Sequence, residues 1–412
     1  MGEVLELDVG NIAGGGGCVA RSPDGRVVFV RHSLPGERVL AVVTADTTSF
    51  MRADAIRILE ASPDRVEPPC PYAGPGRCGG CDFQHVSLEV QRRLKAFRIA
   101  EQLLRVAGVE MEVTVEEIRA NEDGLGWRTR VRLAADEEGR LGFRRQRSHE
   151  LEYVDHCPIA VAGVHKTGAL DAAWPGIDEI EVIAPSGGGG ALVCATMPRQ
   201  PKPHFPEVQA GLVVNAKVVE KPGFVVNTVT NVSFQVSAGV FWQVHKDAAA
   251  VLVKAVRAAL GAERGDNVVD LYAGAGLFSV VLAHQVGRQG SVLAIERDKR
   301  AVADAQHNGR DSPQMVVRKA SVNPKLVEHS IGRPDLLVLD PAREGAGKAV
   351  MSALATHASN LRRLVYVSCD PASFSRDIRV LLDAGWTLTS LRAFDIFPMT
   401  EHVELVGTLS PR

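Results

Sequence analysis

Long hydrophobic runs, an excess of one charge and a rich supply of cysteine are all missing from this sequence. A membrane-spanning helix needs about 20 consecutive apolar residues, and no stretch approaches that length. The 47 Lys and Arg residues nearly balance the 49 Asp and Glu residues, so no overall positive field indicates a nucleic-acid partner. The first residues include Glu3 and Glu6, where a secretory signal would be basic. Seven cysteines are too few for a disulfide scaffold. We therefore expect a cytoplasmic protein with no membrane partner.

The first sixty residues show the alternation of apolar and polar positions that is typical of short strands. Strands are expected over 4–9, 18–20, 27–30, 38–44 and 52–59, with a Pro-Asp-Gly turn between the second and the third. About five short strands predict a small antiparallel barrel of the OB type, a fold that often binds oligonucleotides. A barrel with a purely structural role is the alternative.

Residues 61–82 are rich in Pro, Gly and Cys, which is typical of a boundary between domains. A helix is expected over 87–106, ended by Gly108. Its apolar side is expected to carry Leu94, Phe97 and Leu104. Mixed strands follow, and the segment 126–149 contains seven arginines and no lysine. Such a run is usually a solvated strand face, but arginine without lysine also favours phosphate recognition.

From about residue 225 onward, helical and strand patterns alternate. Strands are expected over 267–271, 291–296, 335–339 and 364–368, and helices over 247–260, 277–284, 299–308, 346–358 and 371–384. This alternation predicts a doubly wound parallel sheet with ligands at the carboxyl ends of its strands. We expect a fold of the α/β class in three parts: a barrel over 1–62, a small central α+β domain over 63–220 and an α/β domain over 221–412.

A nucleotide pocket is expected where the strand 267–271 ends. The turn that follows contains Gly274 and Gly276, which allow the backbone to approach a ligand at a helix start. Ser279 stands where a dinucleotide fingerprint has its third glycine. Glu296 ends the next strand, twenty residues after Gly276, where its carboxylate can accept both ribose hydroxyls of an adenosyl ligand. The pattern favours S-adenosylmethionine over NAD, with a dehydrogenase or a degenerate core as alternatives.

Cys369 stands between a buried strand and a helix that begins near Pro371. The helix dipole at that end is expected to lower the pKa of its thiol, although a buried inert cysteine is the alternative. Asp340 follows the preceding strand, and Glu404 belongs to an acidic segment near the end of the chain. A thiolate, a carboxylate and a methyl donor together suit the methylation of pyrimidine C5. The thiolate adds to C6 to activate C5, and the carboxylate removes the C5 proton.

With these residues the chain resembles the S-adenosylmethionine-dependent RNA 5-methyluridine methyltransferases over nearly its whole length. The matching motifs are Phe241-Trp242-Gln243-Val244, the stretch 270–276, the stretch 340–345, Tyr366-Val367-Ser368-Cys369 and the stretch 395–404. The resemblance implies a Rossmann-like class I methyltransferase domain and an N-terminal TRAM barrel. It also implies that Cys369 is the nucleophile and Glu404 the base. The residues that would contact the cofactor are Gln243, Tyr272, Glu296 and Asp340.

The chain departs from the family pattern at a few positions. Asp370 stands where the family usually has Asn, and an extra acid there tends to raise the pKa of Cys369. Leu277 and Ala320 stand where some members have an Asn that touches the cofactor. Glu401 is an acid where the family does not need one.

Four cysteines are candidates for a metal centre: Cys70, Cys78, Cys81 and Cys157. Four thiolates suit zinc and an iron–sulfur cluster equally, and their spacing does not choose between them. The family resemblance implies a structural [4Fe–4S] cluster between the barrel and the methyltransferase domain.

The expected partner is RNA, with a large-subunit rRNA favoured over tRNA by the resemblance, and the expected oligomeric state is a monomer. Two alternatives stay open. One is methylation of cytosine C5, which uses the same thiolate chemistry. The other is an iron–sulfur RNA-binding protein whose methyltransferase domain is inactive.

Overall fold

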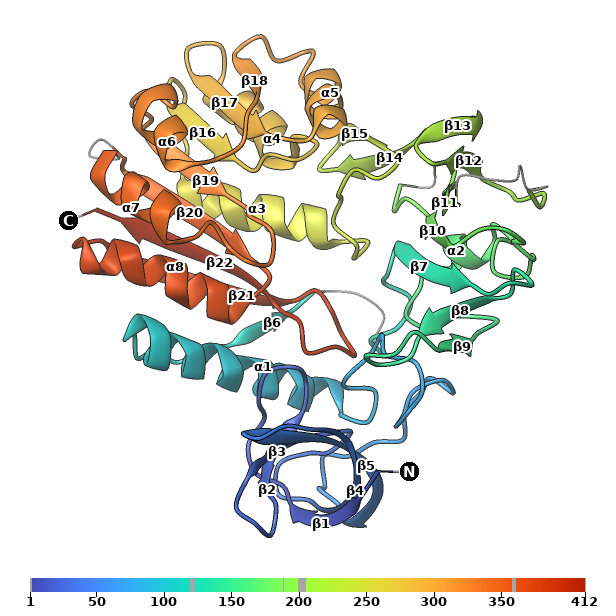
Figure 1. The fold of residues 1–412 in the computed structure, drawn as a ribbon. Coiled ribbons are helices and arrows are strands. Elements are labelled where there is room, and N and C mark those ends of the chain that lie inside the picture. Colours follow the sequence, from blue (N-terminus) through green and yellow to red (C-terminus); the bar gives the residue numbers. More distant parts are fainter. Residues whose placement is uncertain (1, 119–122, 188, 199–204, 358–360, 412) are drawn as a thin grey trace.

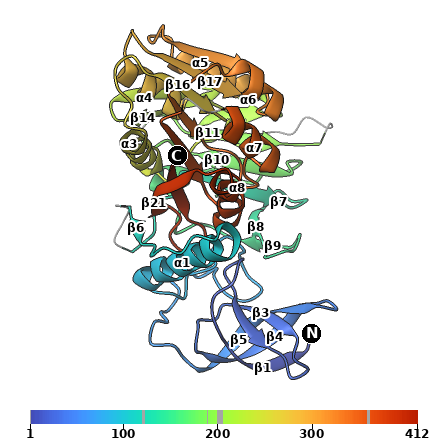
Figure 2. The ribbon, with the colours of Figure 1, turned by 90° about the vertical axis from the view of Figure 1, so that its left-hand side faces the viewer.

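The computed structural model describes residues 2–118, 123–187, 189–198, 205–357 and 361–411. The barrel lies at one end of the molecule, the C-terminal α/β domain lies at the other end, and the central sheet lies beside that domain (Figure 1). Helix α1 (Leu88–Gln102) lies between the barrel and the C-terminal domain in both views (Figures 1 and 2). Among the described residues, no helix has the length and apolar content needed to cross a membrane.

The N-terminal barrel has the five predicted strands. They are β1 (Val4–Asp8), β2 (Cys18–Arg21), β3 (Val27–Arg31), β4 (Arg38–Asp46) and β5 (Phe50–Glu60), in the order β1-β4-β5-β3-β2. The Gly10 amide donates to the Val19 carbonyl at 2.7 Å, which links the segment after β1 to β2. The pairing of β3 with β5 is parallel, so the prediction of a wholly antiparallel barrel is wrong for this pair. The reason is that β4 reverses the chain between β3 and β5.

Helix α1 continues into one π-helical turn, η1 (Leu103–Ala107), and Gly108 ends it in the left-handed conformation with φ +70°. The predicted helix end is therefore confirmed. Of its predicted buried side, Leu94 is partly buried against the core of the barrel, whereas Phe97 is 43% exposed and Leu104 is 55% exposed, so the prediction is wrong for these two. The face that packs on the protein instead carries Val90, Gln91, Lys95 and Ile99. Gln91 can be buried there because its amide nitrogen donates to the Phe83 and Val86 carbonyls and its oxygen accepts from the Met399 amide. The partners of Lys95 are described below.

The central part is a seven-stranded sheet of order β13-β12-β11-β10-β7-β8-β9. Its strands are β7 (Arg130–Ala135), β8 (Leu141–Arg144), β9 (Leu151–Tyr153), β10 (Glu179–Ile183), β11 (Leu192–Thr196), β12 (Gly211–Val214) and β13 (Lys217–Glu220), with the short helix α2 (Ala162–His165). All its strand pairs are antiparallel except β11 with β12. Its core surrounds the fully buried Trp174.

The C-terminal domain has an eight-stranded sheet of order β18-β17-β16-β19-β20-β22-β21-β6. The strands are β16 (Asn267–Leu271), β17 (Ser291–Glu296), β18 (Met315–Lys319), β19 (Leu336–Leu339), β20 (Arg363–Ser368), β21 (Thr387–Asp395), β22 (Glu404–Ser410) and β6 (Val115–Glu117). The first five in this order are parallel, as predicted for four of them, and β18 was not predicted. The antiparallel return through β21 and β22 was not predicted.

Six helices belong to this domain. They are α3 (Ala248–Leu260), α4 (Leu277–Val286), α5 (Lys299–Asn308), α6 (Pro324–Ser330), α7 (Lys348–His357) and α8 (Pro371–Asp383). The expected last residue of the α7 helix, position 358, lies outside the described residues. Segment 88–117, expected in the central domain, instead joins this one, because α1, η1 and β6 share its hydrophobic core and its sheet.

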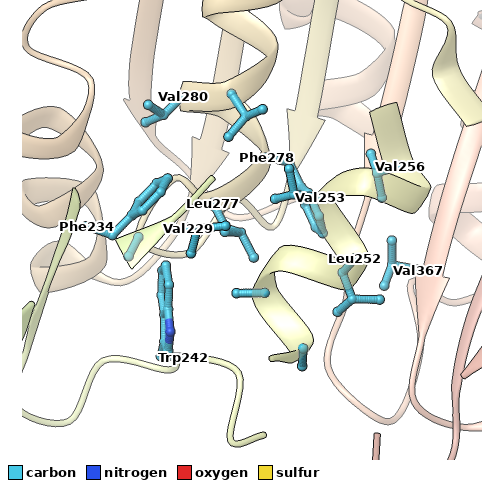
Figure 3. Packing of buried hydrophobic residues seen from close by; sticks show 14 of the residues in the cluster. Val229, Phe234, Trp242, Leu252, Val253, Val256, Leu277, Phe278, Val280 and Val367 are labelled. Atoms are coloured by element: carbon cyan, nitrogen blue, oxygen red, sulfur yellow. The ribbon is translucent and has the colours of Figure 1, made fainter. Parts of the chain in front are cut away.

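A hairpin of β14 (Phe224–Val229) and β15 (Val232–Ser237) leads into α3. Phe234 of this hairpin and Trp242 of the following loop pack beside Leu277 and Phe278 at the start of α4 (Figure 3). The ring centroids of Phe234 and Trp242 are 5.3 Å apart. This packing fixes the loop that carries Gln243 against the core of the C-terminal domain.

Candidate active site

The candidate catalytic residues lie at the carboxyl edge of the parallel strands. Asp340 follows β19, and Cys369 follows β20. β22 runs antiparallel to β20, in a register that pairs Leu405 with Ser368. Glu404, the first residue of β22, therefore lies beside Cys369. β21 thus brings the chain to the edge where the parallel strands end, and β22 begins at that edge and runs back.

Burial and nearby negative charges determine the pKa of the Cys369 thiol. Its pKa is raised to about 12, first by burial and then by Glu404 and Asp340, while Arg343 opposes the shift and Asp370 adds to it. The expected lowering by the start of α8 is therefore wrong in direction, because burial and three acids outweigh the helix dipole. Asp370 raises the pKa of Cys369, as expected from the sequence. The free protein holds this thiol protonated at neutral pH.

Three buried carboxyl groups continue from this thiol along the strand ends. Burial, and then the charge of Asp270, raise the pKa of Asp340 to about 7. Burial also raises the pKa of Asp270 to about 7, against the hydrogen bond that it accepts from the Ser279 hydroxyl. The pKa of Glu404 is raised well above its ordinary value by burial and by Asp340. Carboxyl groups whose pKa is raised above its ordinary value are suited to general acid–base catalysis.

The predicted cofactor residues of the first two strands meet in one turn. Tyr272 and Gly274 both adopt left-handed backbone conformations, with φ +64° and +55°, and Gly276 caps α4 with φ +87°. The Gly274 amide donates to Glu296 Oε2 at 3.0 Å, which brings the ends of β16 and β17 together. A side chain on Gly274 would meet no atom within 4 Å, so the turn faces open space.

Asp270 lies beneath this turn and is fully buried. Within the described part of the chain, its Oδ1 is buried and accepts no hydrogen bond. A buried acceptor without a partner is costly unless a ligand satisfies it. The turn and this oxygen therefore fit a ligand that brings hydrogen-bond donors, as the adenosyl and amino groups of S-adenosylmethionine do.

Gln243 does not lie at the end of a parallel strand. It is buried in the loop between β15 and α3. The structure therefore brings together Tyr272, Gly274, Gly276, Glu296 and Asp340 along one sheet edge, and it places Gln243 on a separate segment packed against the same core.

A cavity of about 80 Å³ opens in front of Cys369. Three parts of the chain form its walls: the barrel, helix α1 and the C-terminal domain. The polar and glycine residues that line it are Gly14, Gly15, Lys95, Arg98, Arg343, Cys369, Asp370, Glu401 and His402. This cavity is where a molecule that reacts with Cys369 has to enter.

The sequence did not reveal Lys95 as a residue of this region. Its Nζ lies 2.5 Å from Asp395 Oδ1 and donates to the Phe397 carbonyl at 3.0 Å. Both side chains are almost completely buried. The pair fixes the loop 396–403, which precedes Glu404. Lys95 lies four positions from both Gln91 and Ile99 on α1, but nothing in the sequence indicates that this charged side chain faces inward.

Asp377 of α8 is a second residue that the sequence did not reveal. Its Oδ2 accepts hydrogen bonds from the Ala346 amide at 2.7 Å, the Gly347 amide at 3.1 Å and the Tyr366 hydroxyl at 2.7 Å. These contacts hold the segment that follows Asp340 against α8. A single aspartate in a helix interior carries no pattern that predicts this role.

The four candidate metal-binding cysteines line one cavity of about 120 Å³. Cys70, Cys78 and Cys81 come from a loop that the β-bridge between Cys78 and Arg145 joins to the β8–β9 hairpin, and Cys157 follows β9. Burial raises the pKa of all four thiols, to about 12 for Cys81 and about 11 for Cys157. Within the ranges that the structure describes, no three His, Cys, Asp or Glu side chains are placed to hold one metal ion.

The arginine-rich segment is mostly engaged with the protein itself. Arg130 is buried, and its Nη2 donates to the Val240 carbonyl at 2.9 Å. Three others pair with acids of the same sheet: Arg132 with Glu179, Arg140 with Asp136, and Arg145 with Glu150. The segment is therefore neither the uniform solvated face nor the open row of phosphate-binding groups that the sequence suggested.

Two families match parts of the chain. Residues 1–56 match the TRAM domain, and residues 231–362 match the Methyltransferase small domain. The predicted combination of an N-terminal barrel and a Rossmann-like methyltransferase domain is confirmed.

Curated relatives extend over the whole chain. A protein of Streptomyces coelicolor, named as an uncharacterized RNA methyltransferase, is 45% identical over 100% of this chain and 93% of its own length. A protein of Streptomyces avermitilis with the same name is 44% identical over 100% of this chain and 99% of its own length.

Among solved structures, the tRNA (uracil-54, C5)-methyltransferase of Pyrococcus abyssi in complex with S-adenosyl-L-homocysteine is similar to this chain with a TM-score of 0.74. The match covers 98% of this chain and 100% of that structure, at 21% identity. It shows that the order of barrel, central sheet and α/β domain is a known arrangement.

Proposed function

Because the chain belongs to the RNA methyltransferases and carries a TRAM domain, we propose that it methylates C5 of a uridine in structured RNA through a covalent adduct between Cys369 and C6. S-adenosylmethionine is the proposed methyl donor. The observation that carries the proposal is the placement of Glu404 beside Cys369 at the carboxyl edge of the sheet, where Cys369 lines a cavity. A nucleophile and a carboxylate are the two groups that C5 methylation requires.

The chemistry follows from the weakness of C5 as a nucleophile. The Cys369 thiol first loses its proton to water, the thiolate sulfur then forms a bond to C6, and the electron pair of the C5–C6 double bond makes C5 nucleophilic. When bound, S-adenosylmethionine supplies an electrophilic methyl group that C5 can attack. Glu404 then takes the C5 proton, the C5–C6 double bond re-forms, and the bond from carbon to the Cys369 sulfur breaks.

The surroundings of the two groups suit these steps. The raised pKa of Glu404 makes it a stronger base than an exposed carboxylate, provided that it is ionised when the C5 proton leaves. Arg343, which acts to lower the pKa of Cys369, lines the same cavity and can stabilise the thiolate as it forms. The target uridine has to leave its stack to reach this cavity.

Five residues would hold the methyl donor. Gly274 and Gly276 allow its close approach to the turn, Glu296 offers carboxylate oxygens to ribose hydroxyls, and Tyr272 and Asp340 flank the space between them. Gln243 is proposed as a further contact on the resemblance to the family alone. The unpaired Asp270 Oδ1 supports the presence of a ligand here.

We further propose that Cys70, Cys78, Cys81 and Cys157 hold a [4Fe–4S] cluster. All four cysteines line one cavity, so they can share one group. The choice of a cluster over zinc rests on the resemblance to the family. The group would have a structural role, because it would join the cysteine loop to the central sheet. Iron and sulfide assays on anaerobically purified protein test this assignment, and zinc in place of iron would contradict it.

The proposed substrate is a uridine of large-subunit rRNA, with tRNA as the alternative, and the proposed form is a cytoplasmic monomer. The test is to incubate the protein with S-adenosylmethionine and cellular RNA that carries tritium at uracil C5, and then to measure tritium released to water. Release that depends on the methyl donor supports the proposal. Methyl transfer without tritium release would favour another target atom. Donor binding without any transfer would favour an inactive RNA-binding protein.

A further inference from the structure

A glycine loop of the barrel reaches the cavity in front of Cys369. The Gly15 amide donates to Glu401 Oε2 at 2.6 Å, and the Gly16 amide donates to the same oxygen at 2.8 Å. The other oxygen, Oε1, lies 3.8 Å from Arg343 Nη2. Two consecutive amides and a guanidinium therefore surround one oxyanion. Successive backbone amides of this kind form concavities that bind anions.

The glycines expose these amides without a covering side chain. Gly15 has φ +85°, and a Cβ atom there would meet nothing within 4 Å. Gly16 has φ +70°, and a Cβ atom there would lie 2.6 Å from the Cβ of Asp82. Gly15 also lines the cavity that contains Cys369. The two amides are thus held at the wall of the reactive pocket and face an anion.

The anion that now fills the position is a side chain that can leave it. The Glu401 side chain is 20% exposed. Its amide donates to Asp82 Oδ2 at 3.4 Å, and its charge helps to raise the pKa of Asp82 after burial does. Arg343 also lies 3.8 Å from Asp370 Oδ2. Three acids lie close together here. Arg343 is placed between Glu401 and Asp370, and Arg31 Nη2 lies 3.4 Å from Oδ1 of the third acid, Asp82.

We propose that the Gly15 and Gly16 amides and the Arg343 guanidinium form a binding site for a backbone phosphate of the RNA, and that the Glu401 carboxylate occupies this site in the free protein. The inference rests on the proposed function, since a uridine that reaches Cys369 brings its own phosphates to the mouth of the cavity. Carboxylate and phosphate oxygens accept the same charge-assisted hydrogen bonds. Glu401 is therefore a competitor of the RNA and sets how tightly the target strand is held.

The test measures binding of a fluorescently labelled, uridine-containing RNA hairpin to the full-length protein. Glu401→Gln keeps the shape of the side chain and removes its charge, so it is expected to tighten binding by about two- to tenfold. Glu263→Gln is the matched control, because Glu263 is exposed and lies next to the amino-terminal end of β16, opposite the site. Unchanged or weaker binding by the Glu401 variant would show that the contact is only a clasp between the barrel and the C-terminal domain, and would overturn the proposal.

A second variant tests the other part of the site. Arg343→Gln is expected to weaken RNA binding and to reduce the slope of log affinity against log salt by about one, both alone and together with Glu401→Gln. An unchanged slope would remove Arg343 from the phosphate site.

Tritium release by the wild-type protein is measured in parallel. If the wild-type protein releases tritium and the Glu401 variant binds RNA with unaltered affinity, the phosphate site is refuted and the proposed function is retained. Tighter binding by the Glu401 variant, without tritium release by the wild-type protein, would support the phosphate site and contradict the proposed function.

Discussion

The cavity at Cys369 and the cavity of the four cysteines contain thiols of similar pKa in different surroundings. The pKa is about 12 for both Cys369 and Cys81, and burial is the main cause in each. The charges that raise these pKa values further differ. Glu404 and Asp340 act on Cys369, whereas on Cys81 a hydrogen bond with Gln84 lowers the pKa and the other three cysteines raise it. A shifted pKa therefore does not identify a catalytic cysteine. The neighbours do, since carboxylates can move protons and a set of thiols can hold a metal group.

Removal of the Cys369 thiol is expected to have the largest effect and to separate the two cavities most clearly. Cys369→Ala should lower turnover by on the order of 10⁴-fold or more, because no other group can form the bond to C6. Binding of S-adenosylmethionine, measured by calorimetry, should be retained. Residual turnover at the wild-type rate would show that Cys369 is not the nucleophile.

Glu404→Gln is expected to lower turnover by about 10²- to 10⁴-fold, since it removes the base and keeps the thiol. The methylated adduct should then accumulate, and a denaturing gel should show protein that is covalently bound to RNA. Cys369→Ala should give no such band. Absence of the band in the Glu404 variant, together with slow normal turnover, would assign proton removal to another group.

The cysteine cavity is tested by Cys81→Ser. This change should remove most of the iron and lower the melting temperature by several degrees, because a bound group stabilises the folded state. Cys194→Ser is the control, as Cys194 is partly buried in β11 and lines neither of these two cavities. Equal iron content in the two variants would contradict the assignment of the cluster.

The electrostatic difference between the two thiols is tested by Asp340→Asn. The negative charge of Asp340 raises the pKa of Cys369, so its removal should lower that pKa and increase the thiolate fraction at any given pH below it. Alkylation of Cys369 by iodoacetamide at pH 8, followed by mass spectrometry, should become faster by up to about tenfold. Cys81 should react at its wild-type rate. Equal acceleration at both cysteines would indicate loosened structure.

The smallest expected effect is on RNA affinity, when an arginine beside the cysteine cavity is replaced. Arg132 lines the cysteine cavity and pairs with Glu179 at 3.4 Å on an exposed strand face. Arg132→Ala is expected to change RNA affinity by less than about twofold, since exposed pairs contribute little and this side chain is already engaged. A loss of affinity as large as that of Arg343→Gln would place the main phosphate contact on the central sheet.

Much of the C-terminal domain could be predicted because its elements are local patterns. The strands Asn267–Leu271 and Ser291–Glu296 and the helix Lys299–Asn308 have the bounds that the sequence indicated. The buried face of α1 could not be predicted in this way. Hydropathy placed Phe97 and Leu104 inside, whereas the structure exposes both and buries Lys95, whose partner Asp395 lies 300 residues away.

The features of the candidate site likewise fall into those that local sequence predicts and those that depend on distant segments. The sequence by itself placed Cys369 after a strand, Gly276 at a helix start and Glu296 at a strand end, because these positions depend on neighbouring residues. Only the tertiary structure decided that Glu404 lies beside Cys369, that Glu401 meets Gly15 across 386 positions, and that the Cys369 pKa rises when a helix dipole should lower it. Hydropathy and turn residues report local conformation, whereas burial and charge interactions depend on distances between segments that meet only in the folded chain.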